Sequence, residues 1–124
     1  MPQTPAPPLV VIADDDEAVC RALQFTVELD GYRVVTCRSA GALLALDLPS
    51  REACLVIDER LPDLSGLRAL AQLRRRGCRL PAVILTSHPS RQLRAAAVQA
   101  RAPILEKPLL EDGLIDWIRS AIAH

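Results

Sequence analysis

The sequence predicts an α/β fold in which five β-strands alternate with five α-helices. The strands form a five-stranded parallel sheet that is doubly wound, (βα)5, with helices on both faces. Short apolar runs rich in β-branched residues recur along the chain and are typical of strands buried on both faces. A segment with apolar residues near helical spacing follows each run. Because the connections are short, each helix must return the chain to the same sheet by a right-handed crossover.

The first half of the chain holds two pairs of strand and helix. The apolar run LVVIA at Leu9–Ala13 is typical of a buried strand and ends abruptly in acidic residues. Gly31 follows the next amphipathic segment, where a helix C-terminus favours a residue that tolerates positive φ. Ser39 is suited to cap the second helix. The expected elements are a strand from Leu9 to Ala13, a helix from Glu17 to Asp30, a strand from Tyr32 to Cys37, and a helix from Ser39 to the break at Pro49 and Ser50.

The second half repeats the alternation three more times. The run Ala53–Ile57 is apolar throughout and, like the first strand, ends on an acid, Asp58. Leu61–Gly66 is a loop by composition. The expected elements are a strand from Ala53 to Ile57, a helix marked by Leu67, Leu70 and Leu73 and closed by Gly77, a strand from Leu80 to Leu85, a helix from about Ser90 to Arg101, a short strand around Pro103 to Glu106, and a helix from about Glu111 to Ala123.

Length and charge indicate one domain, which we place at residues 9–124. About half of the 124 residues are apolar, which suffices for a core without metals or disulfides. Fifteen basic and fifteen acidic residues balance, so the net charge gives no reason to expect a nucleic-acid or membrane partner, and any basic surface must be local. No apolar run approaches membrane-spanning length.

The cysteines and the first residues point to a cytoplasmic protein. The four cysteines are far apart, without metal-ligand spacing, and are expected to be reduced and mostly buried thiols. Residues 1–8 include four prolines and lack the charged and apolar regions of a secretory signal. We expect them to form a short disordered tail.

Chemically reactive side chains follow four of the expected strands. The carboxyl ends of parallel strands meet at one edge of the sheet, where α/β proteins place their functional crevice. Residues distant in sequence are therefore expected to converge there. In chain order they are Asp14, Asp15 and Asp16, then Asp58, then Thr86 and Ser87, and then Lys107 followed by Pro108.

This group of residues suits phosphoryl transfer with Mg²⁺. Several carboxylates in one pocket repel each other unless a cation offsets their charge, and hard carboxylate oxygens suit Mg²⁺. A magnesium-bound carboxylate can attack a phosphoryl donor and form an aspartyl phosphate. The Lys107 ammonium and the Thr86 hydroxyl would then stabilise the negative charge of the transferring group.

Four segments, in this order and at the correct strand ends, carry a resemblance to a known family. They are Ala13–Glu17 (ADDDE), Val56–Gly66 (VIDERLPDLSG), Ile84–Ser87 (ILTS) and Glu106–Pro108 (EKP). From Leu9 to Ala123 the chain resembles the receiver domains of two-component response regulators, which have a flavodoxin-like fold. It looks most like receivers that precede a helix-turn-helix output domain.

The resemblance implies a role for each site residue. Asp58 would be the phosphoacceptor, with the phosphoryl group supplied by a sensor histidine kinase or a phosphotransfer protein. The magnesium site would comprise Asp14, Asp15, Asp58 and the backbone carbonyl of Arg60, with Asp15 a direct ligand. Thr86 and Lys107 would contact the phosphoryl oxygens. The protein would be a phosphoacceptor switch, with self-catalysed phosphotransfer and autodephosphorylation only, and not a metabolic enzyme.

The resemblance also implies an output face. Phosphorylation would shift the face formed by the fourth helix, the fifth strand and the fifth helix, and this face would form a homodimer or control an output partner. Ile104 occupies the position where these receivers usually carry Tyr or Phe. The common Gly-Ala before the fifth strand is replaced by Ala100–Pro103, and this segment is one residue short. These departures concern the output more than the phosphorylation chemistry.

Two other functions compete with the switch. A phosphorylation-independent adaptor would keep the fold and bind through its helices; Ile104 favours it and the complete acidic pocket opposes it. An aspartyl-phosphate phosphatase usually has a second carboxylate two residues after the nucleophile, and Arg60 occupies that position. The structural alternative to the site roles is that Asp14–Asp16 only cap a helix and that Lys107 is a solvated loop lysine.

Five further features have structural interpretations. Asp16 is suited to cap the first helix. His88 is expected to face solvent, and His124 to be disordered at the terminus. Arg74–Arg76 are expected to form a solvated face that favours the helix dipole rather than a nucleic-acid patch. For Trp117, a place in the core and a role as partner anchor both remain open.

Overall fold

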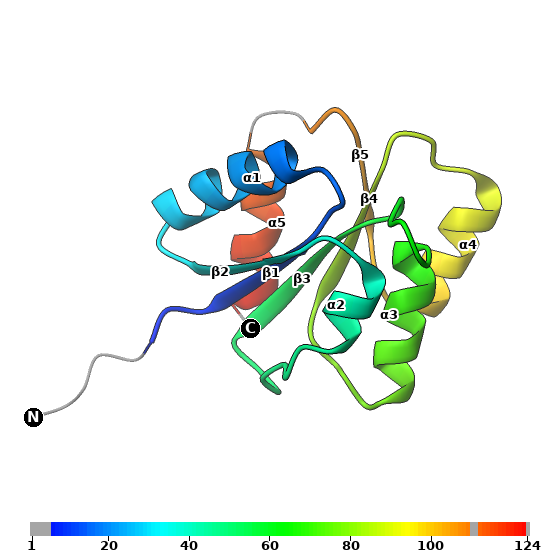
Figure 1. Ribbon diagram of the computed structural model, residues 1–124, viewed down its shortest axis with the longest axis horizontal. Coiled ribbons are helices and arrows are strands. Elements are labelled where there is room, and N and C mark those ends of the chain that lie inside the picture. Colours follow the sequence, from blue (N-terminus) through cyan, green and yellow to red (C-terminus); the bar gives the residue numbers. More distant parts are fainter. Residues whose placement is uncertain (1–5, 110–111, 124) are drawn as a thin grey trace, which may run out of the picture.

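The predicted (βα)5 fold is confirmed. A computed structural model describes residues 6–109 and 112–123 (Figure 1). Its elements alternate strictly between strand and helix. In chain order they are β1 (Leu9–Ala13), α1 (Glu17–Leu29), β2 (Arg33–Cys37), α2 (Ala40–Leu44), β3 (Ala53–Asp58), α3 (Gly66–Arg75), β4 (Ala82–Thr86), α4 (Arg91–Gln99), β5 (Ile104–Glu106) and α5 (Gly113–Ile122).

The strand order of the sheet creates a crevice. The five strands are parallel and lie in the order β2-β1-β3-β4-β5. The chain runs from β1 outward to β2 and then returns to place β3 on the other side of β1. At such a switch point the loops after the two neighbouring strands separate, and a crevice opens at their carboxyl ends. Ala13 pairs with Ile57, and Asp58 pairs with Leu85, so the three central strands end nearly level.

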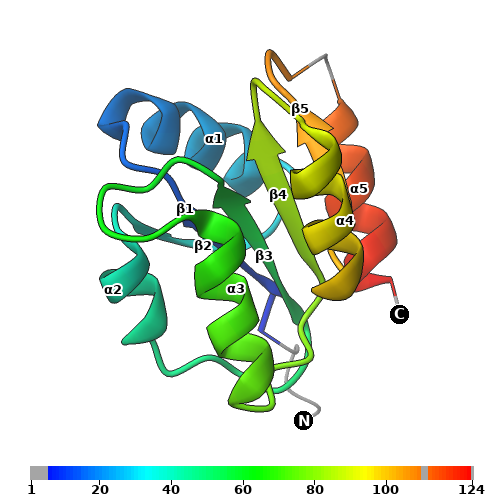
Figure 2. The same cartoon turned by 90° about the vertical axis from the view of Figure 1, so that its right-hand side faces the viewer.

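Helices cover the two faces of the sheet in unequal numbers. Figure 2 shows α2, α3 and α4 on one face, with α1 and α5 on the other. Side chains alternate along each strand between two buried clusters. Val11 and Leu55 belong to the cluster under α2, α3 and α4, whereas Val10 and Val56 belong to the cluster under α1 and α5. The central strands are therefore buried on both faces, as their apolar sequences predict.

Local signals set most helix ends as expected. The Ser39 hydroxyl accepts a hydrogen bond from the Ala42 N–H (3.0 Å) and caps α2. Ser65 and Ser90 cap α3 and α4 in the same way. Gly31 adopts φ 97° after α1, in the left-handed region that favours glycine. The predicted positions of Ser39 and Gly31 are confirmed.

Two boundaries were predicted wrongly. The helix expected to run from Ser39 to Pro49 ends at Leu44. The residue before a proline avoids the helical region, and Leu46 and Leu48 instead pack against the core from a non-helical segment. The fourth strand begins at Ala82 rather than Leu80. Pro81 has no N–H to donate to the sheet, although its carbonyl accepts from Leu55 N (2.8 Å).

Arg74 contradicts the expectation of a solvated arginine face. Its side chain is half-buried and ties α3 to neighbouring segments. Arg74 Nε donates to the carbonyl of Ala100 (3.1 Å), and Nη1 donates to those of Cys78 (3.1 Å) and Leu80 (2.7 Å). These contacts satisfy carbonyls beyond the ends of α3 and α4. Arg75 and Arg76 are exposed, as expected.

Other expectations have mixed outcomes. Cys20, Cys37 and Cys54 are buried, Cys78 is half-buried, and all four are free thiols. Among the described residues, no helix combines the length and apolar character needed to cross a membrane. Trp117 is half-buried against the cluster under α1 and α5, which favours the core interpretation.

The expected tail remains a prediction. Residues 1–5, Glu111 and His124 lie outside the described residues. At the described end of this segment, the Pro7 and Pro8 carbonyls accept hydrogen bonds from Arg33 Nε (2.8 Å) and N (3.0 Å). These bonds tie the entry of β1 to β2.

Candidate functional site

The predicted reactive residues lie around one cavity at the carboxyl ends of the strands. The cavity has a volume of about 500 Å³. The loop after β1, the end of β3, the end of β4 and the residue after β5 each contribute a polar side chain. The predicted site residues that line it are Asp14, Asp15, Asp58, Arg60, Thr86 and Lys107. Asp16, Ser87 and His88 line it as well.

Two carboxylates and one ammonium group form its centre. Asp14 is 1% exposed and Asp58 is 5% exposed. Lys107 Nζ donates a hydrogen bond to Asp58 Oδ2 and lies 3.7 Å from Asp14 Oδ2. The backbone N–H of Lys107 donates to the carbonyl of Thr86 (2.8 Å), which fixes the loop that carries the ammonium group. Lys107 is therefore an ion-pair partner in the site and not a solvated loop lysine.

Each carboxylate is oriented by the backbone that follows it. Asp58 Oδ1 accepts from Arg60 N (2.8 Å), and Asp14 Oδ1 accepts from Asp16 N (2.9 Å). Asp14 Oδ2 is buried and accepts no hydrogen bond from any described residue. A buried carboxylate oxygen without a donor is costly, so this atom is a natural place for a cation or for water bound to a cation.

The electrostatics of the centre follow from burial. The pKa of Asp14 is raised to about 6, chiefly by burial and also by the hydrogen bond and charge of Asp58, against the lowering effects of the Asp16 N–H and Lys107. Burial disfavours the charged form of Lys107, but its hydrogen bond to Asp58 and the charges of Asp58 and Asp14 outweigh this, and the pKa of Lys107 is raised. Lys107 is therefore a cation at neutral pH.

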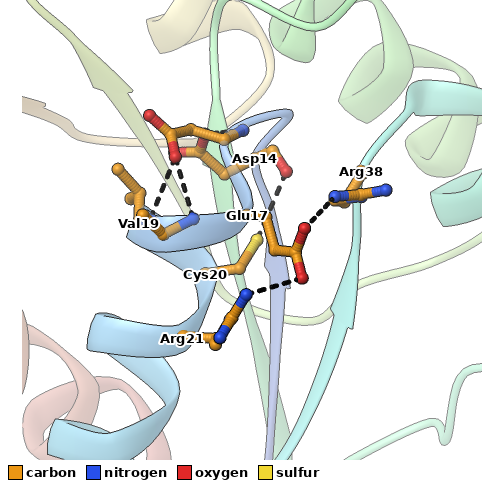
Figure 3. Close-up of polar contacts among 8 residues, drawn as sticks. Asp14, Glu17, Val19, Cys20, Arg21 and Arg38 are labelled. Atoms are coloured by element: carbon orange, nitrogen blue, oxygen red, sulfur yellow. Dashed lines mark hydrogen bonds and ion pairs between the residues drawn. The ribbon is translucent and has the colours of Figure 1, made fainter.

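The three aspartates after β1 have different surroundings. Asp14 is buried, whereas Asp15 and Asp16 are exposed. Asp16 Oδ1 accepts from the N–H groups of Ala18 (2.9 Å) and Val19 (3.3 Å), which confirms the predicted cap of α1 (Figure 3). Because Asp16 alone satisfies the helix end, capping does not account for Asp14 and Asp15. The carboxylate of Asp15 lies at the cavity and makes no hydrogen bond or ion pair with the residues that the structure describes.

Glu59 anchors the loop after β3, a role that we did not predict. Its backbone N donates to the Leu85 carbonyl (2.9 Å), and its carbonyl accepts from Gly66 N (2.9 Å). Its carboxylate Oε1 accepts from Leu67 N (2.8 Å), at the N-terminus of α3. Burial raises the pKa of Glu59, against the lowering effect of this bond. The loop that carries the Arg60 carbonyl is thereby held at both ends.

Gly66 is required by the close approach of α3 to the site. A Cβ atom at this position would lie 2.2 Å from the Asp58 carbonyl oxygen and 2.7 Å from Ile57 Cγ2. The sequence shows a glycine after a serine, but the clash depends on how α3 packs on β3. No local signal could have revealed it.

Asp63 joins the same loop to α2. Its two carboxylate oxygens accept from Ala40 N and Gly41 N, each at 2.8 Å. These hydrogen bonds hold the pKa of Asp63 below its ordinary value. Two N–H groups of α2 that Ser39 does not reach are thus satisfied by a residue far away in sequence.

Thr86 and His88 close the cavity on the β4 side. Thr86 is 8% exposed, and its Oγ1 accepts from His88 N (3.2 Å). The imidazole of His88 is exposed, as expected. The hydroxyl of Thr86 therefore has a fixed acceptor role toward the backbone and a hydrogen free to donate into the cavity.

The donor set fits Mg²⁺. The residues available are the carboxylates of Asp14, Asp15 and Asp58 and the Arg60 carbonyl, all of them hard oxygen ligands. Within residues 6–109 and 112–123, no three His, Cys, Asp or Glu side chains are already gathered in metal-binding geometry. Mg²⁺ usually keeps several waters and uses one or two carboxylates, so it does not require such a cluster. Asp14 Oδ2 accepts no hydrogen bond from any described residue, which agrees with a bound cation nearby.

The fold and this site define a class of protein, and comparison with known families identifies it. The model of the response regulator receiver domain matches residues 10–119. The chain therefore belongs to the response regulator receiver domain family of two-component signalling.

The chain is similar to the receiver parts of longer regulators. It is 34% identical over 116 residues to the transcriptional regulatory protein FixJ of Azorhizobium caulinodans, covering 93% of this chain and 55% of FixJ. It is 33% identical over 115 residues to the response regulator protein TodT of Pseudomonas putida, covering 92% of this chain and 51% of TodT. The chain thus spans about half the length of these curated relatives.

Solved structures agree with the assignment to the receiver family. The crystal structure of FixJ-N has a TM-score of 0.83 and 32% identity and covers 98% of this chain and 97% of that one. The response regulator StyR has a TM-score of 0.87 and 32% identity, covering 95% of this chain and 60% of StyR. The flavodoxin-like receiver fold is confirmed.

Proposed function

We propose that this chain is a phosphorylation switch that accepts a phosphoryl group on Asp58, with Mg²⁺, from the phosphohistidine of a sensor histidine kinase or phosphotransfer protein. One observation carries the proposal. Asp14, Asp58 and Lys107, from three different strand ends, meet as two buried carboxylates and one cation in a cavity at the switch point of the sheet. The family membership supports it.

Asp58 has the surroundings of a positioned nucleophile. It is buried at the end of a central strand, with Oδ1 held by Arg60 N and Oδ2 by Lys107 Nζ. Such fixing lowers the entropy cost of attack. One carboxylate oxygen would form the new bond to phosphorus as the bond to the histidine nitrogen breaks.

Asp15, Asp58 and the Arg60 carbonyl would hold the metal, with Asp14 beside them. Bound Mg²⁺ would offset the carboxylate charges and stabilise the phosphoryl oxygens. Lys107 would exchange part of its ion pair with Asp58 for one with the phosphoryl group. The Thr86 hydroxyl, which has a hydrogen free to donate, would bind another phosphoryl oxygen.

The output would be a change in the face formed by α4, β5 and α5. The position of the usual aromatic residue is occupied by Ile104, which is half-buried and packs against the cluster under α2, α3 and α4. Any response must therefore come from movement of β5 and α4 themselves and not from rotation of a ring. We propose that this face controls an output partner or forms a homodimer, in a cytoplasmic protein.

The switch would have no external substrate to turn over. Arg60, two residues after Asp58, lines the cavity in place of the carboxylate that a phosphatase would use as acid or base. We therefore propose phosphotransfer to Asp58 and slow self-catalysed hydrolysis as the only reactions. The domain itself would bind neither nucleic acid nor membrane.

A second candidate function is a phosphorylation-independent adaptor. It is favoured by Ile104, because the inward packing of this side chain leaves no ring to report phosphorylation. The adaptor reading does not account for the buried ion pair or for Asp14 Oδ2, which accepts no hydrogen bond from any described residue.

The test is intact mass after incubation with acetyl phosphate, with and without Mg²⁺. We expect one labile phosphoryl group, absent without Mg²⁺ and absent in Asp58→Asn. Asp63→Asn is the matched control, since Asp63 lies in the same loop but outside the cavity lining. No gain under any condition would reject the switch in favour of the adaptor. A gain that persists in Asp58→Asn would assign the acceptor elsewhere.

A further inference from the structure

The zero net charge of the chain conceals a strongly basic segment. Residues 64–105, from the end of the β3–α3 loop through β5, contain eight arginines and no Asp, Glu or Lys. All fifteen acidic residues lie in the rest of the chain. In space this segment comprises α3, β4, α4 and most of β5, so arginines of α3 and α4 lie on two helices that cover the same face of the sheet. Figure 2 shows α3 and α4 together on the same face of the sheet.

A groove with an apolar floor lies between these two helices. Its volume is about 420 Å³, and its apolar lining residues are Leu67 and Ala71 of α3, Ala96 of α4 and Ala100 directly after α4. Because three of these four residues are alanines, the backbone of a partner could approach closely. The groove shares no lining residue with the phosphorylation cavity.

Arginines form the α3 side of the groove. Arg68 and Arg75 are exposed, and neither makes an ion pair with any acidic side chain that the structure describes. Arg74, by contrast, donates to backbone carbonyls from Nε and Nη1 and joins α3 to the residue after α4. The groove thus combines small apolar residues with two guanidinium groups that make no ion pair with a described residue and that lie on the same face of α3, about two turns apart.

We propose that the α3–α4 groove binds an acidic amphipathic helix of a partner protein. An apolar ridge on that helix would cover Ala71 and Ala96, and carboxylates flanking the ridge would pair with Arg68 and Arg75. This binding goes beyond the phosphorylation switch and does not depend on Asp58. A nucleic acid fits less well, because it brings no apolar ridge and its extended charge would meet the acidic remainder of the chain.

A designed peptide tests the proposal on the intact chain. The probe is an acetylated and amidated helix of about 18 residues with leucines at i, i+3, i+4 and i+7 spacing and glutamates on both flanks. We expect saturable binding by fluorescence anisotropy. A peptide of the same composition, with leucines and glutamates exchanged so that no apolar face forms, should bind at least about tenfold more weakly.

Charge reversals locate the binding surface. We expect Arg68→Glu with Arg75→Glu to weaken binding by about tenfold or more. The matched control is Arg91→Glu with Arg94→Glu, which makes the same change in net charge on exposed residues of α4 that do not line the groove. This control should change Kd by less than about threefold. Circular dichroism should show both variants folded, since none of the four arginines is buried.

A second pair tests the apolar floor. Ala96→Glu places a charge in the groove, whereas Ala95→Glu places it on the preceding residue, which is also exposed but does not line the groove. Only the first should weaken the peptide complex. These residues are neighbours on one helix, so an effect confined to Ala96 cannot arise from general repulsion.

Four results would overturn the proposal. The first is no saturable binding up to about 1 mM peptide, and the second is equal weakening of binding by the two double charge reversals. The third is a DNA duplex that binds as tightly as the peptide and loses its binding with the same substitutions. The fourth is self-association of the chain that disappears in the Arg68→Glu, Arg75→Glu variant. The last two would assign the groove to nucleic acid or to a second copy.

Discussion

Lys107 Nζ donates a hydrogen bond to Asp58 Oδ2 while it lies 3.7 Å from Oδ2 of Asp14. One cation therefore lies close to two buried carboxylates, and Asp14 Oδ2 accepts no hydrogen bond from any residue that the structure describes. The ammonium group neutralises only part of the local negative charge. The remaining negative charge favours the binding of an additional cation. The first prediction follows from the raised pKa of Asp14.

Without Mg²⁺, stability should fall as the pH rises from about 4 to about 6. The pKa of Asp14 is raised to about 6 from 3.8, so the folded state binds this proton more tightly than the unfolded chain does. The stability is therefore fully present below the unfolded pKa and is lost as the pH rises through the folded pKa. The loss should be roughly 2 kcal/mol.

Urea unfolding in EDTA at pH 4.5 and pH 7 measures this difference. Asp14→Asn should abolish most of it and should be more stable than the parent at pH 7. Lys107→Met should enlarge it, because removing the cation raises the pKa of Asp14 further. Equal pH dependence in the parent and Asp14→Asn would contradict the explanation.

Mg²⁺ should stabilise the folded chain through Asp15. At a concentration about five times Kd, the ion should raise the free energy of unfolding by about 1 kcal/mol. Asp15→Asn should remove most of this gain. Asp16→Asn is the control, because it removes the same charge from a neighbouring residue while asparagine still caps α1. A similar loss in both variants would point to nonspecific ion binding.

Gly66→Ala should be strongly destabilising. The new Cβ would lie 2.2 Å from the Asp58 carbonyl oxygen, so α3 or the end of β3 must shift. We expect a loss of about 2–4 kcal/mol in chemical unfolding. Gly113→Ala, at the corresponding start of α5, meets no atom within 4 Å and should change stability by less than about 1 kcal/mol. Comparable stability of the two variants would show that the approach of α3 is not tight.

Asp63→Ala should loosen the start of α2. The variant loses the acceptors of Ala40 N and Gly41 N, so hydrogen exchange of these two amides should become faster. Ser39→Ala, the control, should act on Ala42 N instead.

The Asp63 contacts should also weaken in acid. Because the pKa of Asp63 is lowered on folding, its contribution is present above the unfolded pKa and is lost as the pH falls through the folded pKa. Exchange at Ala40 that is unaffected by Asp63→Ala would contradict the assigned role.

The sequence by itself determined the order of elements and the positions of the main site residues. Burial on both faces requires continuous apolar strands, and a strand must end where polar residues appear, so Asp14, Asp58 and Thr86 could be placed at strand ends. Caps such as Ser39 and Asp16 act within a few residues and are equally readable. The parallel order of strands then implied that these residues converge.

Only the tertiary structure decided what depends on contacts between distant segments. The anchoring of the loop by Glu59, the steric need for Gly66, the link from Asp63 to α2 and the burial of Arg74 all involve partners that no local pattern specifies. The same holds for the basic groove, since the arginines of residues 64–105 are visible in the sequence but their arrangement around an apolar floor is not. Periodicity reports which face of an element is buried; the packing of one element on another determines what that face meets.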